Sequence, residues 1–136
     1  MFLVYSPEGS ETPNRWKYNP RKIMSAEREW IERRTDRNWS EFTKDVIQGN
    51  SLCRRALLFT YLKREHPTVK WDDVDFAWDE LKLEYSKAEL IELRATVADS
   101  VSGDERAAVL EKLDTEIAEA VEDPDDEGKA QLPVAD

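Results

Sequence analysis

The sequence predicts a mainly α protein, in which a small N-terminal β-hairpin is followed by a compact helical bundle and an acidic C-terminal helical extension. Five segments carry apolar residues at helical spacing, and one short β-prone run precedes them. All five Trp, four Tyr and four Phe residues lie within the first 85 of the 136 residues. Because aromatic side chains bury large areas and dominate small cores, we expect residues 1–85 to form the folded body.

Charge divides the chain at the same place. Residues 1–85 carry 15 acidic and 15 basic side chains, whereas residues 86–136 carry 15 acidic and five basic ones. The whole formal charge of −10 therefore belongs to the C-terminal part. We expect an acidic helical extension over residues 86–122 and a disordered acidic tail over residues 123–136.

The N-terminal segment has the pattern of a β-hairpin. Phe2–Tyr5 is rich in β-prone residues, and Arg15–Tyr18 alternates polar and aromatic residues, as a half-buried strand does. Between them, Pro7–Ser10 contains a Pro and a Gly, which suit a turn. Asn19 and Pro20 end the second strand.

Two helices follow in the body. The first is expected over Ser25–Thr35, with Ser25 as its N-cap and Glu27 in its first turn. The second is expected to begin near Asn38, whose side chain can cap it, and to end at Gly49, which suits a left-handed backbone. Their apolar faces are expected to comprise Trp30, Ile31, Phe42, Val46 and Ile47.

A third helix is expected over Ser51–Glu65, where apolar residues recur most regularly, and His66 and Pro67 close it. Trp71–Glu80 is expected to form a short helix or two turns, followed by a short connection. The apolar positions that predict the third helix are Leu52, Ala56, Phe59 and Leu62.

The acidic part contains two capping signals. Ser86 and Ser102 each begin the pattern S-x-x-E, in which each of the two side chains caps the other's backbone. We expect helices from these residues to about Asp99 and about Glu122, and we expect Pro124 to end the second.

Residues suited to catalysis are scarce. His66, the only histidine, lies at a helix end with no Ser or Cys placed to use it, so we expect a structural or neutral role. Cys53, the only cysteine, is expected to be half-buried and unreactive, although Arg54 and Arg55 beside it could lower its thiol pKa. The sequence contains no phosphate-binding glycine motif. No cofactor is therefore expected, and an enzyme is the least favoured class.

The acidic cluster at Asp72–Asp75 is the best candidate for a metal site. A calcium loop starting at Asp73 would have acids at positions 1, 3 and 12. However, Ala77 cannot ligate at the fifth position, and Trp78 occupies the position that needs Gly. We expect instead that Asp72 or Asp73 caps a helix and that the other acids face water.

Two ideas about nucleic acid arise from the predicted helices, one from the body and one from the acidic half. The second and third helices, joined at Gly49, superficially resemble a DNA-binding helix-turn-helix. In this comparison Arg54 and Arg55 lie near the start of the third helix. A neutral body and a strongly acidic chain oppose phosphate binding. The reverse idea, that the acidic half mimics DNA, stays open as an alternative.

The sequence contains no pattern for a membrane span or for secretion. Its longest apolar run, Ala56–Phe59, is far shorter than the ~18 residues of a spanning helix. No basic and apolar signal segment opens the chain, so we expect a cytoplasmic protein. One cysteine excludes an internal disulfide framework.

A series of spaced residues runs through the middle of the chain. It comprises Trp16–Pro20, Met24–Glu27, Ile31, Glu32, Thr35, Trp39, Phe42, Gly49, Arg55–Leu58, Leu62–Arg64, Pro67 and Asp72–Phe76. This series resembles the tail assembly chaperones of long-tailed phages, most closely those from phages of actinobacteria. The resemblance covers about residues 14–85. Where many relatives have Gly after Thr35, this chain has Asp36 and Arg37.

The resemblance implies a protein without enzymatic activity. Such chaperones bind the long helical tape measure protein, keep it soluble, and leave as tail tube subunits polymerise around it. The resemblance also implies a protein of the host cytoplasm that is absent from the mature virion. Further candidate partners are the tail tube protein and a frameshift-extended form of the chain itself. Self-association is a further expectation, whereas neither a nucleic acid nor a membrane is expected as a partner.

The aromatic residues outnumber what so small a core obviously needs, so some are candidates for an exposed binding surface. The alternative, that all of them are buried, stays open. The acidic extension either keeps a complex soluble by charge repulsion or packs its apolar stripe on the body. The candidate partner-binding residues are Trp71, Phe76, Trp78 and Leu81, which lie outside the main helical stripes, with Tyr61 as an additional candidate.

Two other functions fit the same sequence. A structural virion component, such as a small tail or head–tail connector protein, would share the size and fold class and would be found in purified virions. An acidic inhibitor of host DNA-binding proteins would place its acids on an ordered surface and would need no aromatic patch.

Overall fold

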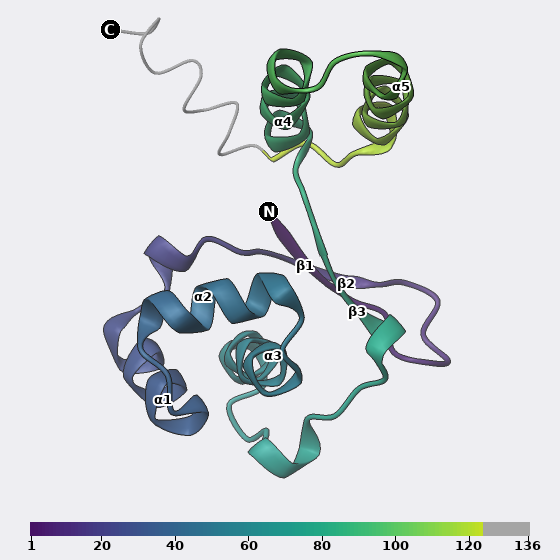
Figure 1. The fold of residues 1–136 in the computed structure, drawn as a ribbon. Coiled ribbons are helices and arrows are strands. Elements are labelled where there is room, and N and C mark those ends of the chain that lie inside the picture. The colour runs from purple at the N-terminus through teal and green to yellow at the C-terminus, as the bar shows by residue number, and fades with distance from the viewer. Residues whose placement is uncertain (124–136) are drawn as a thin grey trace, which may run out of the picture. The chain divides into compact units, whose positions relative to one another are not determined.

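The computed structural model describes residues 1–123 and shows a mainly α-helical protein with one small sheet (Figure 1). Within these residues there are five α-helices and three short strands: two strands open the chain as expected, and the third lies between the third and fourth helices. The predicted fold class is therefore confirmed. Pro124 and the tail expected after Asp123 lie outside the described residues.

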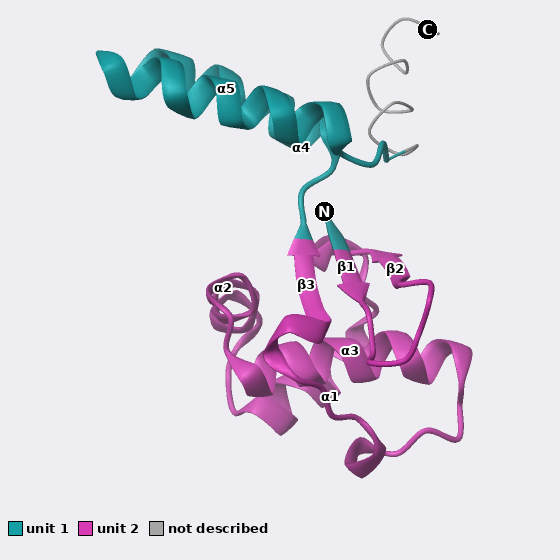
Figure 2. Cartoon of the chain, turned by 90° about the vertical axis from the view of Figure 1, so that its right-hand side faces the viewer, with its two compact units in different colours: residues 1–2, 84–136 teal, residues 3–83 magenta. Residues whose placement is uncertain are grey.

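The chain divides into two compact units, which Figure 2 shows in different colours. The larger unit, which we call the body, comprises Leu3–Leu83 and contains the first three helices. The other comprises Met1–Phe2 and the chain from Glu84 onward, and it contains the last two helices. The division falls two residues before the boundary expected from charge and aromatic content.

The sheet has three strands, β1 (Phe2–Tyr5), β2 (Asn14–Lys17) and β3 (Leu81–Glu84), in the order β2-β1-β3. The predicted pairing of the two N-terminal strands is confirmed. The connection expected after Glu80 is wrong, because the chain there forms β3 and joins β1. Leu81–Glu84 alternates apolar and charged residues, with Leu81 buried and Lys82 exposed, so the strand signal was present but was not used.

α1 (Ser25–Thr35) has the predicted bounds but not the predicted cap. Its N-cap is Met24, whose N–H donates to Oε1 of Glu27 at 3.2 Å. The helix ends at Asp36, which has a φ of 52° and is the one non-glycine residue with positive φ in the described chain. A left-handed conformation there explains why glycine suits this position.

α2 (Trp39–Gln48) is capped at both ends as the sequence predicts. The Oδ1 atom of Asn38 accepts the N–H of Glu41 at 2.9 Å. At the other end Gly49 has a φ of 91°. Both signals are local, so the sequence was sufficient to locate them.

α3 (Ser51–Glu65) also has the predicted bounds. Its N-cap is Asn50, which the sequence analysis did not identify and whose Oδ1 accepts the N–H of Cys53 at 3.0 Å. His66 closes the helix as expected, and its N–H donates to the carbonyl oxygen of Leu62 at 2.7 Å.

α1, α2 and α3 pack against one another, and their inner faces form the core of the body together with β1 and β3 (Figure 1). Ile47 and Leu52, which were expected on buried faces, are exposed. Because each residue turns a helix by about 100°, Ile47 lies off the face that Phe42 and Val46 bury. The large side chains that are almost fully buried are Leu3, Ile31, Phe42, Val46, Leu57, Leu58 and Leu81.

Three single turns of 3₁₀ helix complete the body: η1 (Pro20–Lys22), η2 (Trp71–Asp73) and η3 (Trp78–Glu80). The last two are the two turns expected over that segment. In η2, Oδ2 of Asp73 accepts the N–H of Lys70 at 3.1 Å, so an acid of the cluster does cap a helical turn.

α4 (Lys87–Ser100) begins with the predicted capping box. The N–H of Ser86 donates to Oε1 of Glu89 at 2.9 Å, and the N–H of Glu89 donates to Oγ of Ser86 at 3.3 Å. α5 (Asp104–Glu119) packs against α4.

The second predicted capping box is wrong. The residue before α5 is Gly103, not Ser102, and no side chain caps the helix there. Gly103 has a φ of 79°, which turns the chain before the capping geometry of S-x-x-E can form. α5 also ends at Glu119, three residues earlier than expected, and Asp123, expected in the tail, is buried.

Candidate partner-binding surface

Trp78 is an aromatic residue with 66% of its surface exposed, although the backbone that carries it is fixed. It begins η3, and Glu80 at the end of that turn accepts two backbone N–H groups. Ala77 donates to Oε1 at 2.6 Å, and Glu8 donates to Oε2 at 2.7 Å. These hydrogen bonds lower the pKa of the Glu80 carboxyl group. The turn is thereby tied to the loop between β1 and β2.

The Trp78 ring lies over Gly49, in the turn between α2 and α3. A Cβ atom added at Gly49 would lie 2.6 Å from Cη2 of the ring, and the backbone there has a positive φ. Glycine alone satisfies both conditions without strain. The close approach of ring and backbone therefore depends on this residue.

Arg54 supports the same ring from α3. Its guanidinium carbon lies 5.3 Å from the centroid of the Trp78 ring, which is within cation–π range. Its Nε donates to the carbonyl oxygen of Val46 at 2.9 Å, an acceptor in the last turn of α2. Burial lowers the pKa of Arg54. The cation under the ring is thus held in place by a helix end.

Two exposed aliphatic residues flank this turn along the chain. Ile47 lies in the last turn of α2 and is 48% exposed, and Leu52 lies in the first turn of α3 and is 38% exposed. An exposed aromatic ring supported by Arg is typical of the residues that dominate binding energy in interfaces. We call Ile47, Gly49, Leu52, Arg54 and Trp78 together the Trp78 surface.

Trp71 has a structural environment instead. It is half-buried, and its ring centroid lies 5.6 Å from that of Trp30 and 5.8 Å from that of Phe59. The guanidinium groups of Arg34 and Arg55 cover its ring at 4.4 and 4.2 Å. Arg55 also donates to the carbonyl oxygen of Trp71 at 2.9 Å. Trp71 therefore anchors the segment after α3 to α1 and α3.

Tyr61 and Leu81, two of the five candidate partner-binding residues, do not belong to an exposed surface. Tyr61 is buried, its hydroxyl donates to the carbonyl oxygen of Lys17 at 2.9 Å, and burial raises its pKa to about 12. Leu81 is buried as the first residue of β3. Phe76 is half-buried. Of the five candidates, Trp78 alone is exposed.

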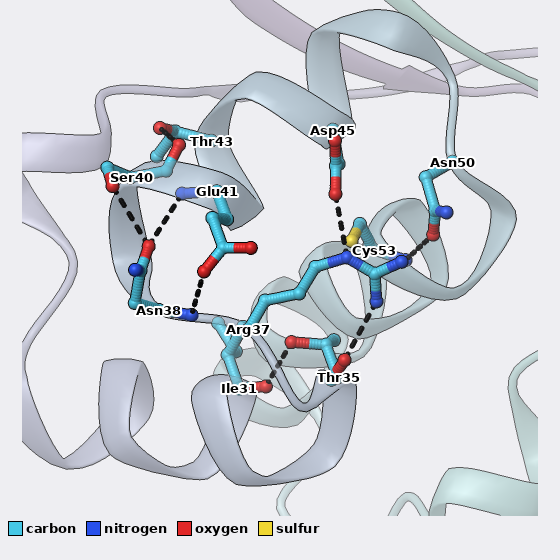
Figure 3. Close-up of polar contacts among 10 residues, drawn as sticks. All are labelled: Ile31, Thr35, Arg37, Asn38, Ser40, Glu41, Thr43, Asp45, Asn50 and Cys53. Carbon is cyan, nitrogen blue, oxygen red and sulfur yellow. Dashed lines mark hydrogen bonds and ion pairs between the residues drawn. The ribbon is translucent and has the colours of Figure 1, made fainter.

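Cys53 is more buried than the sequence predicted. It has no exposed surface, and burial raises the pKa of its thiol, although Arg37 nearby acts in the opposite direction. Figure 3 shows the thiol behind the Arg37 side chain, beside the Asn50 cap. A buried thiol with a raised pKa is a poor nucleophile, so the structure favours a packing role.

Arg37 joins the end of α1 to α2, a structural role that the sequence did not indicate. Its Nε donates to Oδ2 of Asp45 at 2.7 Å, and its Nη1 donates to the carbonyl oxygen of Thr35 at 2.7 Å (Figure 3). The hydroxyl of Thr35 in turn donates to the carbonyl oxygen of Ile31 at 2.8 Å. These bonds fix the turn between the two helices.

The acidic cluster does not gather into a metal site. Asp73 caps η2, and Oδ1 of Asp75 accepts the N–H of Phe76 at 2.9 Å. Across residues 1–123, no three His, Cys, Asp or Glu side chains are placed to hold one metal ion. His66 ends α3 and is exposed.

Comparisons with known proteins identify no relative. No family model, curated protein or solved structure matches the chain. In the described part of the chain, none of the helices has the length and apolar character needed to cross a membrane.

Proposed function

We propose that this chain is a non-enzymatic phage tail assembly chaperone, which binds the tape measure protein and keeps it soluble while the tail tube assembles. The proposal is supported by the resemblance over residues 14–85. The single observation that carries it in the structure is the exposed ring of Trp78, held between Gly49 and Arg54.

Physical chemistry connects this surface to the function. A long helical protein that waits for its tube exposes apolar side chains, which would otherwise associate with one another. A fixed, exposed aromatic ring covers such a side chain with little loss of conformational entropy. The formal charge of −10 then opposes aggregation of the complex.

The proposed setting is the host cytoplasm, and the protein is absent from the finished virion. The tail tube protein and a frameshift-extended form of this chain are proposed as further partners. Self-association through exposed apolar residues remains part of the proposal.

Co-expression with the tape measure protein of the same genome tests the function. We expect the tape measure protein to become soluble and to co-purify with the full-length chain. Trp78→Ala should reduce the co-purified amount severalfold, since removal of a central aromatic anchor typically costs 2 kcal/mol or more, roughly a thirtyfold loss of affinity. Met24→Ala is the matched control, because Met24 is equally exposed (68%) but lies outside the Trp78 surface.

An insoluble tape measure protein with nothing co-purified would contradict the proposal. Mass spectrometry of purified virions then separates the other functions. A structural virion protein would be present in the particles, whereas an inhibitor of host DNA-binding proteins would be absent from them and would bind those proteins instead.

A further inference from the structure

The apolar core of α4 and α5 is small, and Val97, Leu110 and Ile117 are only half-buried. Leu90 and Leu113 are the apolar side chains that they bury. Units of fewer than about 40 residues rarely hold a fold with their own core and usually need a disulfide, a metal or a partner. The exposed large apolar side chains of this segment are Ile91, Leu93, Val109 and Val121.

The exposed apolar residues border the contact between the two helices. Because an α-helix turns by about 100° per residue, Ile91 lies on one side of the Leu90 position and Leu93 lies on the other. Val109 is four residues before Leu113, so it lies one turn away on a neighbouring part of the same face. The apolar surface therefore continues beyond the area that α4 and α5 cover in each other.

Most of the few cations here are already engaged within this unit. The Nε of Arg94 lies 2.5 Å from Oδ1 of Asp114, and the Nζ of Lys87 lies 3.6 Å from Oε1 of Glu122. The Nε of Arg106 donates to the carbonyl oxygen of Ala98 at 3.1 Å. Seven further carboxylates on the two helices are exposed: Glu92, Asp99, Asp104, Glu105, Glu111, Glu116 and Glu119.

We propose that α4 and α5 together dock a basic amphipathic helix of a partner. The apolar stripe of that helix covers the exposed aliphatic side chains, and its flanking Lys and Arg residues meet the carboxylates, which completes a three-helix bundle. Charge selects this occupant, because residues 86–123 carry 11 acidic and four basic side chains. A second copy of this chain would bring the same acidic excess and would be repelled. The docked helix need not belong to the tape measure protein, so the proposal is independent of the proposed function.

Three synthetic peptides of about 20 residues test the proposal with the full-length chain. The first has Leu at helical spacing flanked by Lys, the second has Glu in place of every Lys, and the third has Ser in place of every Leu. Fluorescence anisotropy of each labelled peptide gives its Kd. We expect the first peptide to bind about tenfold or more tightly than either of the others. Its affinity should fall in about 1 M salt, where the Debye length is near 3 Å.

Two variants locate the binding. Ile91→Ser and Leu93→Ser remove exposed side chains on the two sides of the buried stripe, so at least one of them should weaken binding of the Leu/Lys peptide about tenfold. Met24→Ser removes an equally exposed apolar side chain in the body and should leave the Kd unchanged. Circular dichroism of each variant checks that the helix content is retained.

Several outcomes would overturn the proposal. Equal affinity for the Lys and Glu peptides would remove the charge selection, and equal affinity for the Leu and Ser peptides would remove the apolar groove. Absence of binding, or binding that neither Ile91→Ser nor Leu93→Ser weakens, would show that this surface is not the docking site. A dimer in sedimentation equilibrium that Leu93→Ser dissociates would identify a second copy as the occupant.

Discussion

Gly49→Ala is expected to destabilise the body and to displace the exposed tryptophan at the same time. The added Cβ would lie 2.6 Å from Cη2 of Trp78, at a residue whose φ is +91°. A left-handed backbone costs a residue with a Cβ about 1–2 kcal/mol. Because Ala has less conformational entropy than Gly in the unfolded chain, about 0.4–1 kcal/mol of this cost is offset. Moving the ring off its support also forfeits a cation–π contact with Arg54, worth about 0.5–1 kcal/mol at an exposed site. The expected loss of unfolding free energy is therefore about 1–2 kcal/mol.

A double-mutant cycle with Trp78→Ala separates the two contributions. Without the ring, Gly49→Ala should cost only the backbone part, about 0.5–1 kcal/mol, so the coupling free energy should be about 0.5–1 kcal/mol. Gly9→Ala is the matched control, because Gly9 also has a positive φ (+85°) but nothing within 4 Å of its added Cβ. That substitution should show no coupling to Trp78→Ala.

Urea unfolding followed by tryptophan fluorescence is the appropriate assay. All five Trp residues lie in the first 85 residues, so the signal reports on the body and not on α4 and α5. Four of them remain after Trp78→Ala, and an unchanged m-value shows that the comparison is valid. Equal costs of Gly49→Ala with and without the Trp78 ring would refute the placement of the ring on this turn.

Three other predictions follow from the body. Asp36→Gly should raise the free energy of unfolding by about 0.5–1 kcal/mol, seen as a higher urea midpoint, because it relieves a left-handed backbone, whereas Asp36→Ala should not. The hydrogen bonds from Arg64 lower the pKa of Glu27, so the stability they give is present above the usual pKa of 4.5 and is lost as the pH falls through the lower folded value. Glu27→Gln should therefore flatten the acid side of a stability–pH profile, and an unchanged slope would contradict this. The Cys53 thiol should react with a maleimide only after unfolding in urea, and rapid labelling of the native protein would contradict its burial.

Local signals in the sequence predicted the helices well. The capping residues Asn38 and Ser86 and the terminal Gly49 act within one turn of chain, so their roles can be read without knowledge of the fold. Ser102 carries the same pattern as Ser86 but does not cap, because Gly103 takes a positive φ before the helix begins and becomes the N-cap itself. A capping pattern is thus a preference that one neighbouring dihedral angle can override.

Long-range pairing was the part that the sequence could not reveal. β3 is four residues long and joins β1 from almost the other end of the body's sequence, so its alternating residues could suggest a strand but not its partner. This pairing buries Leu81, which had been a candidate for partner binding. The same limitation applies to Tyr61, whose hydroxyl finds the carbonyl oxygen of Lys17, 44 residues away in the chain.

Exposure of Trp78 was among the expectations from the sequence, whereas exposure of Ile47 and Leu52 was not. The excess of aromatic residues indicated an exposed ring, and Trp78 is exposed. Ile47 and Leu52 were assigned to buried faces, because helical spacing alone does not fix where a face ends. Arg54 was considered beside Cys53 and in a helix-turn-helix comparison but not as a partner of Trp78, because that contact depends on how α3 meets η3.

Most of the aromatic side chains pack against one another inside the body, so few of them are accessible to a partner. Trp16 stacks on Tyr61 with centroids 5.8 Å apart, and Trp39 stacks on Phe42 at 4.9 Å. The exposed large hydrophobic side chains of the body are Met24, Ile47, Leu52 and Trp78, so Trp78 is the exposed aromatic anchor of this unit. A single anchor of this kind supports modest affinity. A second, chemically different surface on α4 and α5 would then matter greatly, because two modest sites on one chain raise the effective concentration of each for a shared partner. If both proposals hold, a partner that contacts both sites would bind tightly, and the loss of either contact would return the complex to the modest affinity of the other.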